Sequence, residues 1–247
     1  MERKKPFEFT SFSLHILAMV CMLCDHLWGT VVPGNEWLTC VGRIAFPIFA
    51  FMIAEGYCNT SNLRKYATRL FVFALVSEIP FNLAISGRLF NPLHQNVLWT
   101  FLIAIWMMHL NSLARQKGGR VRKALTCMGT FALGSLLGLI TMVDYFHVGV
   151  MTVLVFYFFR GRNWAERLLQ LAALWYLNCE VLGGLVYEFE LAGRVFTFHQ
   201  QGFALLALIP IWLYRGKQGP YGPGIRRLYY WFYPAHLLIL ALIRMMI

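Results

Sequence analysis

Apolar stretches of about 20 residues follow one another along almost the whole chain, with only short polar connections between them. At a rise of about 1.5 Å per residue, a helix of this length crosses the hydrocarbon core of a bilayer. Hydrophobic residues make up 59% of the chain and charged residues only 13%, which is too few to cover a soluble domain. The sequence therefore predicts an all-α, polytopic transmembrane helix bundle that forms a single integral-membrane domain over residues 1–247.

The predicted membrane spans number about nine. They cover residues 11–33, 36–57, 66–86, 94–112, 123–142, 146–160, 166–187, 199–214 and 227–246. Cys21 and Cys24 form a CxxC within the first span, but no second CxxC or histidine pair completes a metal site, so we expect packing residues and no metal.

The basic residues predict the orientation of the chain. Most of the 22 Lys and Arg residues, beginning with Arg3, Lys4 and Lys5, fall in alternate connections of the nine-span order. The positive-inside rule then puts the N-terminus in the cytoplasm and the C-terminus outside. These loop clusters also account for the net charge of +11, so nucleic acid is not an expected partner.

Ionisable side chains inside the apolar spans are the strongest functional signal. Placing one charge at the centre of a bilayer costs about 2.5–3.5 kcal/mol, so such residues are expected to face one another or a polar cavity. These side chains are Asp25, His26, Arg43, Glu55, Glu78, Glu180 and His236. In the predicted orientation most of them lie in the outer half of the bundle, together with polar residues that open spans there, such as Gln95, Asn96 and Gln201.

Asp25 and His26 are adjacent, so on a helix their side chains point about 100° apart. Asp25 is expected to pair with Arg43 across the turn between the first two spans. His26 then faces the cavity, unless the two residues exchange roles. A purely structural ion pair and a packing histidine remain open alternatives.

Several segments, spread from the first predicted span to the last, resemble the TraX family. They are MVCMLCDHLWG (19–29), GRIAFPIFAFMIAEGY (42–57), KYATRL and SEIPFNLA (within 65–84), QNVLWTF (95–101), VDYFHVGV (143–150), QGFALLALIPIWLYRGKQG (201–219) and YYWFYPAHLLIL (229–240). The family is named for a conjugative-plasmid protein needed for N-terminal acetylation of pilin, and it is distantly similar to membrane acyltransferases.

The resemblance implies an acetyl- or acyltransferase in the cell membrane, with the lipid bilayer and acetyl-CoA as partners. The acyl group would pass from cytoplasmic acyl-CoA to a pilin N-terminus or an envelope sugar or lipid outside. His26 would act as general base, with Asp25 and Arg43 positioning it, and His236 would be the alternative base or a nucleophile.

The resemblance also implies two sets of binding residues. Side chains expected to bind substrate are Glu55, Glu78, Gln95, Asn96, Asp144, Gln201 and Tyr233. Basic residues expected to hold the phosphates of acetyl-CoA at the inner mouth are Lys65, Arg69, Arg215 and Lys217. The alternative function is a proton-coupled small-solute transporter, although no repeat relates two halves of the chain.

Overall fold

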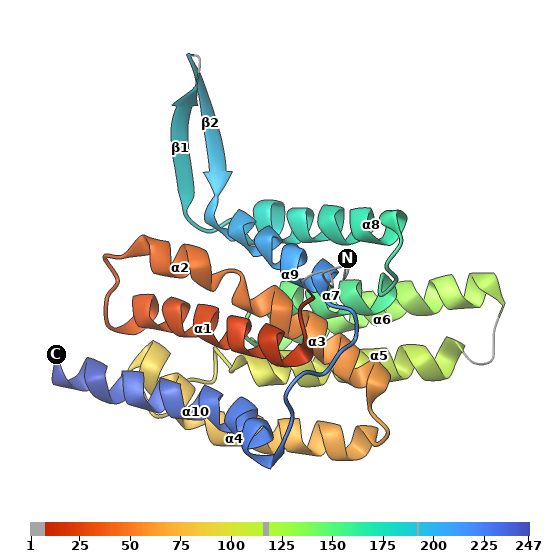
Figure 1. Ribbon diagram of the computed structural model, residues 1–247, viewed down its shortest axis with the longest axis horizontal. Helices are drawn as coiled ribbons and strands as arrows, with labels where there is room; N and C mark the ends of the chain where they lie inside the picture. The colour runs from red at the N-terminus through yellow and green to blue at the C-terminus, as the bar shows by residue number, and fades with distance from the viewer. Residues whose placement is uncertain (1–7, 116–118, 192) are drawn as a thin grey trace, which may run out of the picture.

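The computed structural model describes residues 8–115, 119–191 and 193–247 and is mostly helical (Figure 1). The predicted cytoplasmic residues Arg3, Lys4, Lys5 and Lys117 lie outside the described residues. In chain order the described elements are α1 (Ser11–Thr30), α2 (Glu36–Gly42), α3 (Ala45–Asn59), α4 (Leu63–Ser86), α5 (Val97–Arg115), α6 (Arg120–Ile140), α7 (Phe146–Phe158), α8 (Trp164–Trp175), the π-helix η1 (Tyr176–Leu182), β1 (Val186–Leu191), β2 (Arg194–His199), the 3₁₀-helix η2 (Gln200–Ala207), α9 (Leu208–Leu213) and α10 (Pro223–Met246).

Within the described residues, six helical segments are long and apolar enough to cross a membrane, which makes this a multi-pass membrane protein. They are α1, the α2–α3 pair, α4, α5, α6 and α10. The predicted spans 146–160, 166–187 and 199–214 correspond to shorter segments: α7, α8 with η1, and η2 with α9. The count of nine spans and the orientation therefore stay predictions.

The all-α prediction is wrong between residues 186 and 199, where β1 and β2 form an antiparallel hairpin. The sequence there, VYEFEL followed by RVFTFH, alternates apolar and polar residues with a period near two, which favours strands over a helix. Gly183 and Gly184 precede the hairpin with φ angles of 64° and 81°, which glycine adopts readily. The predicted span 166–187 therefore ends at Leu182, before the hairpin.

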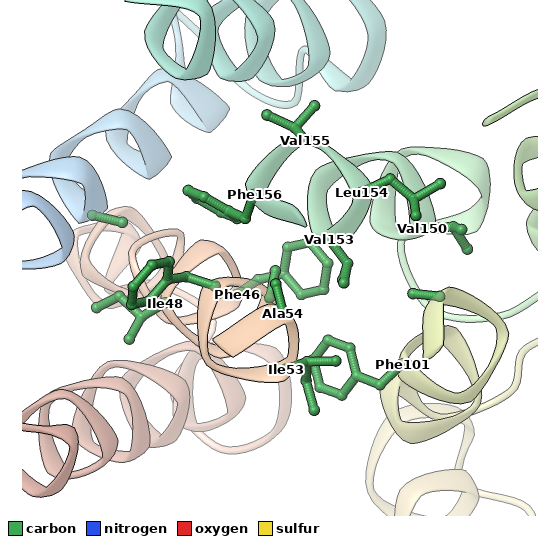
Figure 2. Packing of buried hydrophobic residues seen from close by; sticks show 14 of the residues in the cluster. Phe46, Ile48, Ile53, Ala54, Phe101, Val150, Val153, Leu154, Val155 and Phe156 are labelled. Carbon is green, nitrogen blue, oxygen red and sulfur yellow. The ribbon is translucent and has the colours of Figure 1, made fainter. Parts of the chain in front are cut away.

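Helix α7 lies at the centre of the hydrophobic core and contacts α3, α5, α6 and α8. Figure 2 shows its side chains, including Val153 and Phe156, packed against Phe46 and Ile53 of α3 and Phe101 of α5. A helix surrounded by protein is apolar on all sides, whatever its length. This position explains why a helix of 13 residues reads from sequence as a membrane span.

Two glycines let α6 approach α7 closely. A Cβ atom at Gly134 would lie 2.9 Å from Cγ1 of Val150, and one at Gly138 would lie 2.7 Å from the carbonyl oxygen of Phe146. Any larger residue would push the two helices apart. The GxxxG sequence of α6 is thus a helix-packing motif.

The last helix closes the bundle against the first. In Figure 1 α10 lies beside α4 and α1, and it contacts both of them. Its buried residues include His236 and Leu237. This packing brings His236 next to α1, across more than 200 residues of sequence.

Candidate functional site

An ion pair joins Asp25 on α1 to Arg43, the residue that follows α2. Arg43 Nη2 donates to Asp25 Oδ1, and the two side chains are only 19% and 12% exposed for Asp25 and Arg43 respectively. Thr39 Oγ1 donates to the same carboxylate oxygen at 2.7 Å, and Arg43 Nε donates to the Thr39 carbonyl at 3.2 Å. The predicted pairing of Asp25 with Arg43 is confirmed.

Gly42 makes room for this ion pair, because a Cβ atom at that position would overlap the Asp25 side chain. We expect Gly42→Ala to reduce the free energy of unfolding by about 1–3 kcal/mol through overpacking. The thermal unfolding midpoint of the detergent-solubilised protein measures the effect. Gly29→Ala is the matched control, since a Cβ there meets nothing within 4 Å and alanine favours the helix. Equal losses of stability in both variants would contradict the explanation.

His26 and His236 form a hydrogen-bonded pair. His26 Nδ1 lies 2.7 Å from His236 Nε2, and the rings are stacked with centroids 4.9 Å apart. His236 Nδ1 lies 2.6 Å from the carbonyl oxygen of Phe232. Sequence left open which of the two histidines would act as base, and the structure brings both into one contact.

The hydrogen-bond partners assign the tautomers of this pair. A carbonyl oxygen only accepts, so His236 Nδ1 carries a hydrogen. In a neutral ring His236 Nε2 then accepts, and His26 Nδ1 must donate to it. When both rings are neutral, Nε2 of His26 is therefore the nitrogen that carries no hydrogen. A lone pair of this kind is what a general base requires.

Asp144 lies in the turn between α6 and α7. Its backbone N–H donates to the Gln95 carbonyl at 2.9 Å, and its carbonyl accepts from Thr100 Oγ1 at 2.7 Å. Its neighbours Met142, Tyr145 and Phe146 have φ angles of 52°, 59° and 46°, which are uncommon for residues other than glycine. These two hydrogen bonds fix Asp144 against the start of α5.

Glu78 on α4 belongs to a separate polar group. Its carboxylate accepts from Asn96 Nδ2 at 2.5 Å, Trp99 Nε1 at 3.0 Å and Asn82 Nδ2 at 3.3 Å. Asn96, fully buried, also donates to the Ala74 carbonyl at 2.9 Å. The predicted neighbours Glu78 and Asn96 are in contact, but none of these bonds joins them to Asp25 or His26.

A cavity of about 960 Å³ runs between α1, α3, α4 and α10. One end reaches Met22, Phe232 and Tyr233. These residues adjoin the histidine pair: Phe232 supplies the carbonyl that binds His236, and the Tyr233 ring centroid is 6.3 Å from that of His26. The two histidines do not themselves line the cavity, so they lie just behind its wall.

The other end of the cavity is basic and aromatic. Its charged lining residues are Arg69, Arg160, Arg162, Arg226, Arg227 and Glu55. Glu55 pairs with Arg160, whose Nε lies 2.5 Å from Oε1, and Arg226 lies 5.5 Å from the ring centroid of Tyr221. Deeper inside, the rings of His15 and Tyr229 are stacked with centroids 3.9 Å apart. The arginines outnumber the single carboxylate, so this mouth favours an anion.

Comparison with known proteins decides the family. A family model described as TraX protein matches residues 12–244. The chain belongs to the TraX family. A probable fimbrial assembly protein, FimC of serogroup H1 from Dichelobacter nodosus, is 26% identical over 253 residues, which cover 98% of each chain. Protein TraX of Escherichia coli is 28% identical over 160 residues, covering 64% of this chain and 60% of that protein. No solved structure matches the chain.

In this TraX-family protein the predicted phosphate-binding residues lie in different places. Arg69 lines the cavity mouth, where its Nε donates to Tyr230 Oη at 3.2 Å. Lys65 is exposed and lies outside the cavity lining. Lys217 and Arg215 both pair with Glu8. Of the four, only Arg69 is placed to meet a ligand in the cavity.

The predicted substrate-binding residues are also divided. Tyr233 is buried beside the histidine pair, whereas Glu55 lies at the basic mouth. The Gln95 side chain donates to the Pro92 carbonyl at 3.0 Å, so it fixes the loop before α5. Gln201 is buried in η2, where its backbone N–H donates to Gly183. Neither glutamine is brought into contact with the histidines.

Sequence reasoning missed Thr39 and His15 as parts of the candidate site. Thr39, in α2, carries no sequence signal of its own, because its role depends on how α2 packs against α1. His15 did carry one, since it is an ionisable residue in an apolar span. Its Nδ1 lies 2.8 Å from the Ser11 carbonyl, so Nδ1 carries a hydrogen and Nε2 remains for a ligand.

Within the described ranges, no group of three or more His, Cys, Asp or Glu side chains could hold a metal ion.

His94, in the loop before α5, pairs with Asp144 through its Nε2 at 3.4 Å, and this hydrogen bond raises the pKa of His94. A pKa raised by folding adds stability that is complete below the unfolded value of about 6.5 and is lost as the pH rises through the folded value. We therefore expect the thermal unfolding midpoint to fall as the pH is raised from 6 to 8. His94→Gln should flatten that part of the profile, and an unchanged slope in this variant would contradict the assignment.

Proposed function

We propose that this TraX-family protein is a membrane-embedded acyltransferase that moves an acyl group, acetyl in the simplest case, from acyl-CoA to an acceptor on the opposite side of the membrane. The observation that carries the proposal is the cavity of about 960 Å³, which leads from an arginine-rich mouth to the residues that hold the His26–His236 pair. A donor could enter at one end while the reacting group approaches the base at the other.

The residues of the cavity fit an acyl-CoA. Arginines form strong, charge-assisted hydrogen bonds with phosphate groups, and five of them line the mouth. The stacked His15 and Tyr229 rings offer an aromatic surface for an adenine base. Apolar side chains such as Met19, Leu70 and Phe101 line the path for an uncharged arm. When bound, acetyl-CoA would supply an activated thioester.

The histidine pair would perform the proton transfer. His26 Nε2 takes the proton of an acceptor amine or hydroxyl as that group attacks the thioester carbonyl, and the proton is returned to the leaving thiolate. The Phe232 carbonyl and His236 hold His26 in the required tautomer. The Asp25–Arg43 pair holds the adjoining part of α1 against α2.

The acceptor is proposed from the relatives. Membership of the TraX family suggests pilin acetylation, and the Dichelobacter relative is named as a probable fimbrial assembly protein. A pilin N-terminal amine is therefore the first acceptor to test, with an envelope sugar or lipid as the second. Both would reach the site from the side opposite the arginine-rich mouth.

The direct test uses the purified protein in proteoliposomes with radiolabelled acetyl-CoA and isolated envelope or pilin fractions. Label should pass to an acceptor only when the protein is present. The proposal fails if acetyl-CoA neither binds nor donates label while a solute drives proton flux into the same vesicles, because that result identifies a transporter.

The basic mouth yields a separate prediction. Removing one phosphate contact should raise the KM for acetyl-CoA about tenfold, equivalent to about 1.4 kcal/mol, with little change in kcat. Arg69→Ala and Arg227→Ala are the test variants. Lys217→Ala is the matched control, because its side chain pairs with Glu8. Unchanged KM values for both arginine variants would remove the mouth from the proposed donor site.

A further inference from the structure

The hairpin β1–β2 is the one described element that leaves the helical bundle. In Figure 1 the long helices run across the picture, whereas the hairpin points upward from the end of the bundle at which α2 begins. Helices that cross a bilayer run within a few tens of degrees of its normal. An element that projects across them therefore lies roughly in the plane of the membrane. With six residues in each strand, the hairpin extends about 20 Å from its base.

The two faces of the hairpin differ in chemistry. Directly opposed residues share a face, and the register pairs Phe189 with Phe196 and Glu188 with Thr197. One face, here called the aromatic face, consists of Tyr187, Phe189, Leu191, Phe196 and Phe198, with Arg194 at the tip. The other, here called the acidic face, carries Glu188, Glu190 and Thr197 together with Val186, Val195 and His199.

The aromatic face is turned toward the bundle. At its base, Tyr187 Oη lies 3.4 Å from Cys40 Sγ and 3.2 Å from Glu36 Oε2, both on α2. The Phe198 ring meets that of Phe203 in η2, with centroids 5.2 Å apart. Alternate residues of a strand point to the same side of the sheet. The outer residues of the aromatic face therefore point in the same direction as Tyr187 and Phe198, but they lie beyond the edge of the bundle.

None of the described residues covers the outer part of the aromatic face. Phe189 and Phe196 are stacked, with centroids 5.7 Å apart, yet they are 52% and 43% exposed, and Leu191 is 63% exposed. The hairpin projects sideways from helices that are long and apolar enough to cross a membrane, so its outer part lies beside the lipid that surrounds those helices. Aromatic residues concentrate at the boundary between lipid and water, where Arg can extend its charged end to phosphate groups.

We infer that the hairpin is an interfacial membrane anchor, which lies on the lipid surface with its aromatic face against the acyl chains and its acidic face in water. The occupant of the aromatic face is phospholipid. Burying these rings fixes the hairpin in the membrane plane and holds η2, which follows β2 directly, at a constant depth. The inference does not depend on the proposed transferase activity.

The test places a benzophenone-bearing amino acid at position 196 or at position 197, which are neighbours on opposite faces. Each full-length protein is illuminated in phospholipid vesicles, and the adducts are identified by mass spectrometry. The variant with benzophenone at position 196 should yield phospholipid adducts, whereas the variant with benzophenone at position 197 should yield none. Positions 189 and 190 form a second pair, to be used if a variant at 196 or 197 fails to elute as folded protein.

Three results would overturn the inference. Phospholipid adducts of equal yield from both faces would mean that the hairpin has no preferred side. An adduct between position 196 and a protein would make the aromatic face a docking surface for that protein. If position 196 gave no phospholipid adducts and a water-soluble quencher suppressed the photoreaction of its benzophenone efficiently, the aromatic face would lie in solvent.

Discussion

His26→Ala is expected to reduce acyl transfer by about 10²–10⁴-fold, the usual contribution of a general base. The physical reason is the direction of the hydrogen bonds: the lone pair of His236 Nε2 already accepts from His26 Nδ1, whereas the lone pair of His26 Nε2 is available to take a proton. The loss should appear in kcat at saturating acetyl-CoA, because His26 does not line the donor cavity. Transfer of label from acetyl-CoA in proteoliposomes measures it.

Two further variants separate catalysis from structure. His236→Gln should retain part of the activity, because glutamine can still accept from His26 through its carbonyl oxygen. His109→Ala, near the end of α5 that is remote from Asn96, is the control for loss of a histidine from a membrane helix and should leave kcat unchanged. Normal transfer by His26→Ala, in a protein that inserts and unfolds like the parent, would refute the assignment of the base.

Arg43→Ala is expected to destabilise the protein by about 3–5 kcal/mol, which is the cost of leaving a buried carboxylate without its partner. Both side chains are largely buried, and Asp25 would keep only the hydroxyl of Thr39 as a donor among the contacts described. The measurement is the thermal unfolding midpoint in detergent, where the effect should exceed that of Gly42→Ala.

A double-mutant cycle tests whether the ion pair itself is responsible. Asp25→Ala combined with Arg43→Ala should be less destabilised than the sum of the two single variants, because the double variant leaves no unpaired charge. Arg43→Lys should recover only part of the stability, since an ammonium cannot bind Asp25 and the Thr39 carbonyl through a planar fork. Additive effects of the two alanine replacements would show that Asp25 and Arg43 act independently.

The mismatch between predicted and observed elements has a physical cause in each instance. Hydropathy indicates that a segment is buried away from water, but it does not distinguish burial in lipid from burial in protein. Helix α7 is buried in protein, because α3, α5, α6 and α8 surround it. It is therefore apolar although it is shorter than a membrane span. Residues 186–199 form no long apolar run, and their shorter alternating pattern is the signal of the hairpin.

The sequence by itself determined that this is a membrane protein, because no other environment suits so many long apolar runs, and it identified the ionisable residues that such an environment makes costly. It also predicted the partnership of Asp25 with Arg43, since a short turn leaves those residues few other neighbours. Only the tertiary structure decided that His26 meets His236, that Glu78 belongs to a different polar group and that five arginines share one mouth. These contacts join residues far apart in the chain, and they depend on how α10 packs against α1 and α4, which local periodicity does not encode.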